Sequence, residues 1–253
     1  MSIDRDLEPH LDAIFERPAE EGMSLAMVIV RGGEVVAERY GVKPANDFES
    51  EEPLTAESTL ISWSMAKSIT HAAVGVLVKD GRIDLDAPAP VASWAGTDKA
   101  AITTLQLLEM RSGLRFVEDY VDGETSHVIE MLFGGGAGDH AGYAAAMPLD
   151  HEPGTVWNYS SGTSNIVARI VGDLVGGGRE GMTSFLRERL FEPVGMTSAT
   201  PKFDDAGTFV GSSYVYATAR DFARFGELYR RDGVTSAGER ILPEGWTDHA
   251  RTR

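Results

Sequence analysis

The chain has 253 residues, of which 42% are hydrophobic and 25% charged, so it can form a globular protein with a sizeable core. The 39 acidic and 23 basic residues leave a net charge of −16, which argues against nucleic acid and anionic membranes as partners. There is no cysteine, so disulfides and thiol chemistry are excluded. The charged start of the sequence and the short longest apolar run, Leu25 to Val30, predict neither a signal peptide nor a membrane-spanning helix. A cytoplasmic location is therefore expected.

The first forty residues predict a helix followed by a hairpin. Apolar residues recur at helical spacing from Leu7 to Phe15. Two β-rich runs, 24–30 and 34–40, are separated by Arg31-Gly32-Gly33, which is typical of a hairpin turn. Residues 42–59 contain prolines and many acids and are expected to be a loop.

A strongly apolar helix is predicted from Ser64 to Lys79, with Gly81 ending it. Thr103 and Gln106 form a capping box that begins a short helix. Further along the chain the pattern predicts an irregular segment over 118–138, helices over 165–175, 182–190 and 222–229, and a strand over 209–217.

The order of strands, then many helices, then strand predicts one α/β (α+β) unit spanning residues 1–253. We expect an antiparallel sheet flanked by helices with an inserted all-helical domain. Residues 1–80 and 205–253 form the predicted sheet-containing part, and residues 81–204 form the mostly helical part.

Ser64 and Lys67 are the first candidates for chemistry. They stand three residues apart at the start of the predicted helix, so they share one helix face. A serine hydroxyl becomes a good nucleophile when a neighbouring base takes its proton, and an uncharged lysine can be that base. Burial and the positive end of a helix both favour the uncharged amine. The alternative is a helix-capping serine beside a surface lysine, which fits the apolar opening of this helix poorly.

Other catalytic arrangements fit the sequence less well. His71 lies seven residues after Ser64, about 10.5 Å along a helix axis, so it cannot be a triad histidine for that serine. The six histidines show no metal-ligand spacing, and the glycine clusters lack a nucleotide-binding pattern. Neither a metal nor another cofactor is expected.

Five motifs along the chain carry a resemblance to a known family. They are Ser64-Met65-Ala66-Lys67-Ser68, Asp80-Gly81-Arg82-Ile83-Asp84-Leu85-Asp86, Leu107-Leu108-Glu109-Met110-Arg111-Ser112-Gly113-Leu114, Pro153-Gly154 and Tyr159-Ser160-Ser161-Gly162-Thr163-Ser164-Asn165. Together they resemble the serine β-lactamase-like superfamily. Within it, the class C-type branch is most similar, with its esterase-type and 6-aminohexanoate-dimer (nylon oligomer) hydrolase-type members. The resemblance implies a β-lactamase/transpeptidase-like fold and a serine hydrolase acting on small amides or esters.

The resemblance also implies roles for single residues. Ser64 would be the acylated nucleophile, Lys67 its proton partner and Tyr159 the second base. Ser161 stands where the family often has asparagine, so a hydroxyl replaces the amide that orients substrate, and strong β-lactam turnover is not expected. Tyr120 lies in Glu118–Asp122, which is similar to a substrate-contacting loop of the nylon-oligomer hydrolases. Trp157 flanks the tyrosine motif and is a further candidate for the substrate pocket.

Family members normally continue to a third motif, of the Lys/His-x-Gly type, on a strand that supplies the second oxyanion donor. No such motif occurs at the expected place before Arg253, so the C-terminal strands are expected to be absent from this chain. Two alternatives to an amide or ester hydrolase stay open. One is a β-lactamase or D-amino-acid peptidase of the same fold, and the other is a catalytically silent binding or scaffold protein. The oligomeric state is not indicated by the sequence.

Overall fold

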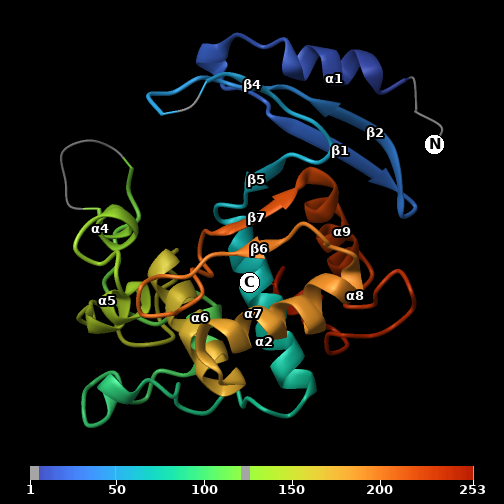
Figure 1. The fold of residues 1–253 in the computed structure, drawn as a ribbon. Helices are drawn as coiled ribbons and strands as arrows, with labels where there is room; N and C mark the ends of the chain where they lie inside the picture. Colours follow the sequence, from blue (N-terminus) through green and yellow to red (C-terminus); the bar gives the residue numbers. More distant parts are fainter. Residues whose placement is uncertain (1–5, 49, 121–125, 253) are drawn as a thin grey trace.

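The computed structural model describes residues 6–48, 50–120 and 126–252 (Figure 1). Its longer helices are α1 (Glu8–Phe15), α2 (Met65–Lys79), α4 (His127–Phe133), α5 (His140–Ala146), α6 (Ser161–Val175), α7 (Gly178–Leu186) and α9 (Ala219–Arg230). Shorter helical segments are η1 (Ala19–Glu21), η2 (Ala92–Trp94), α3 (Thr104–Leu108), η3 (Arg187–Phe191), α8 (Glu192–Val194) and α10 (Trp246–His249). The strands are β1 (Ala26–Arg31), β2 (Glu34–Tyr40), β3 (Val42–Lys43), β4 (Glu52–Pro53), β5 (Thr59–Ile61), β6 (Thr200–Pro201) and β7 (Val215–Thr218).

The predicted hairpin is confirmed as β1 and β2, and adjacent side chains on β2 hold a helix on each face. Successive side chains of a strand point to opposite faces of the sheet. The guanidinium of Arg39 donates to Glu8 of α1 at 2.8 Å. On the other face, Glu38 accepts a hydrogen bond from Arg220 of α9 at 2.8 Å. The hairpin therefore lies between α1 and α9 (Figure 1).

The strands are all antiparallel, but the described residues divide them among three small sheets instead of forming one. β1 pairs with β2, β3 pairs with β4, and β7 lies between β5 and β6. The predicted strand over 209–217 is shorter than expected, since only Val215 onward pairs as β7. The loop predicted over 42–59 contains the short strands β3 and β4.

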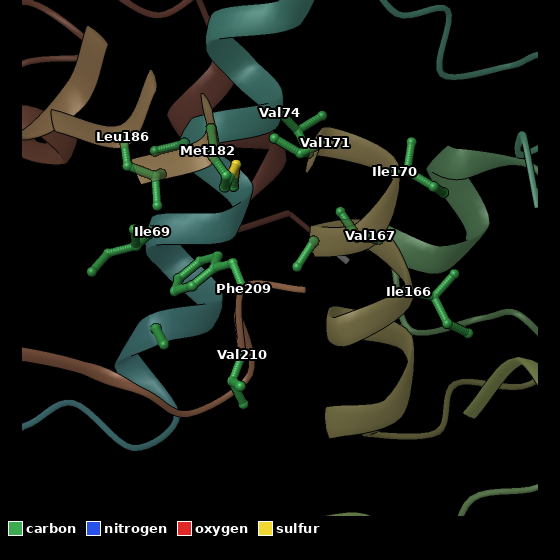
Figure 2. Packing of buried hydrophobic residues seen from close by; sticks show 14 of the residues in the cluster. Ile69, Val74, Ile166, Val167, Ile170, Val171, Met182, Leu186, Phe209 and Val210 are labelled. Carbon is green, nitrogen blue, oxygen red and sulfur yellow. The ribbon is translucent and has the colours of Figure 1, made fainter. Parts of the chain in front are cut away.

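The core is built around α2, which is buried on most sides as predicted. Its apolar side chains pack against α6, and Phe209 and Val210 lie beside both helices (Figure 2). Fully burying an aliphatic side chain contributes about 1.5–3 kcal/mol, so this helix pair supplies a large share of the hydrophobic stabilisation. The buried helix α2 therefore supports the residues at its N-terminus.

Three helical predictions need correction. α6 begins at Ser161, four residues earlier than expected, because Ser160 caps it by accepting the Thr163 amide at 3.0 Å. The segment expected to be irregular contains α4 in its described part. α5, which Asp139 caps, and α10 were not predicted. The capping box at Thr103 is confirmed, and the helix predicted over 222–229 lies within α9, which Thr218 caps.

A buried aromatic cluster joins α10 to the middle of α2. The indole of Trp246 stacks on His71 with ring centroids 4.6 Å apart and donates to the His71 carbonyl at 3.2 Å. Gly75 makes this contact possible, since a Cβ there would lie 2.5 Å from the indole nitrogen. A glycine in a helix lowers stability by about 1 kcal/mol relative to alanine, and the packing of the Trp246 indole against α2 offsets this loss.

The same cluster predicts an acid-sensitive contribution to stability. Burial, reinforced by the nearby His249, lowers the pKa of His71 to about 3. Below pH 6.5 the unfolded chain binds a proton at this histidine and the folded chain does not, so stability falls between pH 6.5 and 3. Replacing His71 with asparagine should make the drop in unfolding free energy from pH 7 to 5 smaller by about 2 kcal/mol.

Urea unfolding at the two pH values measures this difference. His10, an exposed histidine on α1, provides the matched control His10→Asn. If the drop in unfolding free energy from pH 7 to 5 is equal in the His71→Asn variant and the wild type, His71 is not the source of the acid sensitivity.

Candidate active site

A sharp turn between β5 and α2 presents Ser64. Ser62 ties this turn to the neighbouring segment, because its hydroxyl donates to the Ser213 carbonyl at 2.9 Å and accepts the Val215 amide at 3.1 Å. Trp63 has a φ of 43°, in the left-handed region that a non-glycine residue adopts at a cost. Ser64 then stands at the N-cap of α2 with its side chain exposed and not used as a cap.

Lys67 lies one turn into α2 and reaches back to Ser64. Its Nζ is 3.1 Å from the Ser64 Oγ, as the spacing on the helix predicts. The same nitrogen is 3.0 Å from the Ser161 Oγ and 3.1 Å from the Ser212 carbonyl oxygen. The amine is therefore surrounded by three oxygen atoms from three separate segments.

The Ser212 carbonyl is held in place by both core helices. The Ser212 amide donates to the side chain of Asn165 in α6 at 3.1 Å, and Thr70 of α2 donates to the Gly211 carbonyl at 2.8 Å. A Cβ on Gly211 would lie 2.4 Å from the Thr70 hydroxyl, so this close approach requires glycine. These contacts fix the backbone around Ser212 so that its carbonyl oxygen points toward the Lys67 amine.

The N-terminus of α6 brings Ser161 to Lys67. Ser161 is the first residue of the helix and is buried. The Glu118 carboxylate accepts hydrogen bonds from both the Ser161 amide, at 2.6 Å, and the Ser161 hydroxyl, at 2.7 Å. A carboxylate is favoured there because the first amides of a helix are unpaired and carry partial positive charge.

Tyr159 places its ring against the lysine. The Lys67 Nζ lies 4.8 Å from the centroid of the Tyr159 ring, which is a cation–π arrangement when the amine is charged. Trp157 lies next to that ring, with centroids 6.4 Å apart, and is 65% exposed. The backbone of the intervening Asn158 donates to the Met110 carbonyl at 2.8 Å, which fixes this segment against the loop after α3.

An open cavity of about 960 Å³ lies along these residues. Ser64, Lys67, Trp157 and Tyr159 line it, together with residues of α2, α6, the segment after α3 and the segment 249–252. Such a volume suits a small molecule of moderate size. Four of the six predicted site residues therefore face one cavity.

The other two predicted site residues lie beside the cavity and are not among its lining residues. Ser161 is covered and contacts Lys67 directly. Tyr120 is 68% exposed and donates its hydroxyl to Glu118 at 3.3 Å. Although most of the side chain is exposed, partial desolvation of the phenol and the Glu118 charge raise the pKa of Tyr120 to about 12, so the phenol stays a neutral donor. The rest of the predicted substrate loop, Val121 and Asp122, lies outside the described residues.

Sequence reasoning did not assign roles to Glu118 and Ser212. Glu118 lies in the similar segment Glu118–Asp122, and Ser212 lies within the strand predicted over 209–217. Their contacts with Ser161 and Lys67 join positions 43 and 145 residues apart, so no local pattern could reveal them.

The described part of the chain offers no group of three or more His, Asp or Glu side chains that could hold a metal ion. Within the same residues no helix combines the length and the apolar character needed to cross a membrane.

Comparison with known proteins identifies several similar chains. The chain is 30% identical over 243 residues to a 6-aminohexanoate-dimer hydrolase from Paenarthrobacter ureafaciens, covering 92% of this chain and 58% of that protein. A solved structure from Bacillus anthracis with a provisional assignment as a 6-aminohexanoate-dimer hydrolase aligns with a TM-score of 0.75 at 22% identity. That alignment covers 93% of this chain and 61% of the other. A D-amino acid amidase from Ochrobactrum anthropi aligns with a TM-score of 0.64 at 20% identity, over 96% and 72% of the two chains.

The chain thus spans less than two thirds of the curated relative, and the solved structures, all below 25% identity here, establish the β-lactamase-like fold. The family model described as Beta-lactamase matches residues 11–253, nearly the whole sequence. This chain belongs to the beta-lactamase family.

Proposed function

We propose that this protein hydrolyses small amides through an acyl-enzyme on Ser64, with Lys67 and Tyr159 as proton-transfer groups. The observation that carries the proposal is the 3.1 Å contact between the Lys67 Nζ and the Ser64 Oγ beside an open cavity. The related proteins named as 6-aminohexanoate-dimer hydrolase and D-amino acid amidase favour amides over other acyl substrates.

The proposed first step forms a bond between the Ser64 oxygen and the substrate carbonyl carbon. The Ser64 proton passes to the uncharged Lys67 amine, and the carbonyl electrons move onto oxygen. No described residue accepts a hydrogen bond from the Ser64 amide, so this N–H is free to donate to the oxyanion. The adjacent N-terminus of α2 favours the same negative charge.

The second half of the reaction releases both products. As the carbonyl re-forms, the bond to the leaving amine breaks, and the amine takes a proton that Lys67 and Tyr159 supply. Water then attacks the ester carbonyl on Ser64 and gives a proton to the same pair of groups. The bond between the carbonyl carbon and the Ser64 oxygen breaks, this oxygen takes the proton back, and the carboxylic acid leaves. Trp157 and Tyr120 are proposed to contact the substrate, because one lines the cavity and the other stands beside it.

A fluorophosphonate probe tests the nucleophile directly. Attack by the Ser64 oxygen on phosphorus expels fluoride and leaves a stable phosphonyl ester. We expect mass spectrometry of the digested protein to place this adduct on the peptide that contains Ser64. A Ser93→Ala variant, which alters an exposed serine on η2, should be labelled equally.

Well-folded protein that acquires no adduct on Ser64 would overturn the proposal and favour a binding or scaffold role. A chromogenic cephalosporin separates the remaining alternative, since a β-lactamase would hydrolyse it rapidly. We expect slow turnover, because the hydroxyl of Ser161 is committed to Glu118 and Lys67.

A further inference from the structure

Within the described residues, the Glu118 carboxylate accepts hydrogen bonds from three donors that surround it. Its carboxylate accepts from the Ser161 amide, the Ser161 hydroxyl and the Tyr120 hydroxyl, at 2.6, 2.7 and 3.3 Å. An ionised carboxylate has no proton to donate, so it suits all three partners at once. The residue is half-buried and does not line the cavity, so it acts on the site through its neighbours.

This contact fixes the direction of the Ser161 hydroxyl. A serine hydroxyl has one hydrogen and two lone pairs. Because the hydrogen is donated to Glu118, only lone pairs remain on the side that faces the Lys67 Nζ, 3.0 Å away. Ser161 can therefore only accept a hydrogen bond from Lys67.

The second partner of Lys67 is also an obligate acceptor. The Ser212 carbonyl has no proton, and the backbone around it is held by Asn165 and Thr70. An uncharged amine has two N–H bonds and one lone pair. When both N–H bonds go to Ser161 and Ser212, the lone pair is left for the third neighbour, the Ser64 hydroxyl at 3.1 Å.

We infer that Glu118 is a positioning residue: through Ser161 it directs the lone pair of the Lys67 amine at the Ser64 proton. The inference rests on the proposed function and adds a group that determines how the base is oriented. The expected effect of losing the Glu118 charge on the reaction rate is opposite in sign to the effect that a purely electrostatic role would predict. A neighbouring negative charge stabilises a protonated lysine, so its removal alone would increase the reactive, uncharged form.

Glu118→Gln separates the two roles. The glutamine carbonyl must serve the Ser161 amide, which can only donate, so the NH₂ group faces the Ser161 hydroxyl. The hydroxyl then accepts from glutamine and turns its hydrogen toward Lys67, where it competes with Ser64 for the lone pair. We expect the rate constant for fluorophosphonate labelling of Ser64 to fall about 100-fold, within the range typical of general-base contributions.

A double-mutant cycle tests whether Glu118 acts through Ser161. Ser161→Ala removes the hydroxyl and any competing donor, and we expect a smaller loss of about 10-fold, below the usual range for losing a base. Adding Glu118→Gln to Ser161→Ala should cause no further loss, because the connecting group is already gone. Glu118→Asp, which keeps the acceptors, should recover part of the rate. Glu188→Gln, an exposed glutamate on η3, is the matched control.

The pH–rate profile adds a readout that a structural role would not change. We expect Glu118→Gln to lower the labelling rate on the high-pH plateau, where a further rise in pH no longer increases the rate. Thermal unfolding of each variant confirms that the fold is kept. A Glu118→Gln variant as reactive as the wild type, or an equal loss in the Ser161→Ala background, would overturn this inference and leave the proposed function intact. Absence of labelling in the wild type would overturn both.

Discussion

Ser64→Ala is expected to reduce the hydrolysis of a small amide or activated ester by a factor of about 10⁴ to 10⁶. The variant lacks the oxygen that attacks the carbonyl, so no acyl-enzyme can form. The remaining rate would come from substrate held in the cavity beside Lys67 and attacked directly by water. Steady-state turnover with a chromogenic substrate, together with a burst experiment on the wild type, measures the loss and the acyl intermediate.

The change should leave the fold intact. The Ser64 side chain is exposed, does not cap α2, and contacts the Lys67 amine. Ser93→Ala should retain full turnover, because that serine is exposed on another segment. A Ser64→Ala variant that keeps more than a tenth of the wild-type rate would contradict the assignment of the nucleophile and redirect attention to other hydroxyls in the cavity.

Local patterns in the sequence were sufficient for the elements that support the site. The alternation in the hairpin and the apolar periodicity of α2 each satisfy a rule that involves only neighbouring residues. Ser64 and Lys67 meet as predicted because their geometry is set within one helical turn. The resemblance to the family drawn from the sequence rests on motifs of the same local kind.

The polar surroundings of the lysine could not be predicted in this way. The cap and first turn of α6, Ser160 to Ser164, have no apolar periodicity, so the sequence predicts a helix that begins only at Asn165. Besides the Ser160 cap, this start is stabilised by Glu118, a carboxylate 43 residues before Ser161 in the chain. Hydrogen bonds between distant segments depend on tertiary packing, which periodicity does not encode.

The strand before α9 shows the same limit. Residues 209–214 have strand-like composition, yet side chains of Thr70 and Asn165 bind the backbone of Gly211 and Ser212. These contacts take the place of strand pairing and turn the Ser212 carbonyl toward Lys67. The misjudged segment is thus one that supplies a contact to the candidate site.

Replacing Lys67 with methionine is expected to lower the acylation rate of Ser64 by about 10³-fold, the scale of a lost general base. Methionine keeps the length and apolar packing of the side chain but has no lone pair able to take the serine proton. Lys67→Arg is the more informative companion, because its guanidinium keeps the positive charge and cannot be deprotonated in proteins. If proton transfer is the role of Lys67, both variants should be similarly slow.

The two variants separate a base from a fixed charge. If Lys67 served only to stabilise negative charge near Ser64, arginine would retain most of the rate and methionine would not. Lys79→Met is the matched control, since Lys79 is exposed in the last turn of the same helix. Single-turnover labelling across a range of pH gives the acylation rate without product release.

Because methionine leaves the Ser212 carbonyl and the Ser161 hydroxyl without their lysine partner, an accompanying loss of about 1–3 kcal/mol in stability is also expected. That loss should appear in urea unfolding and, being independent of the substrate, should not alter the comparison with arginine at temperatures where both variants are folded.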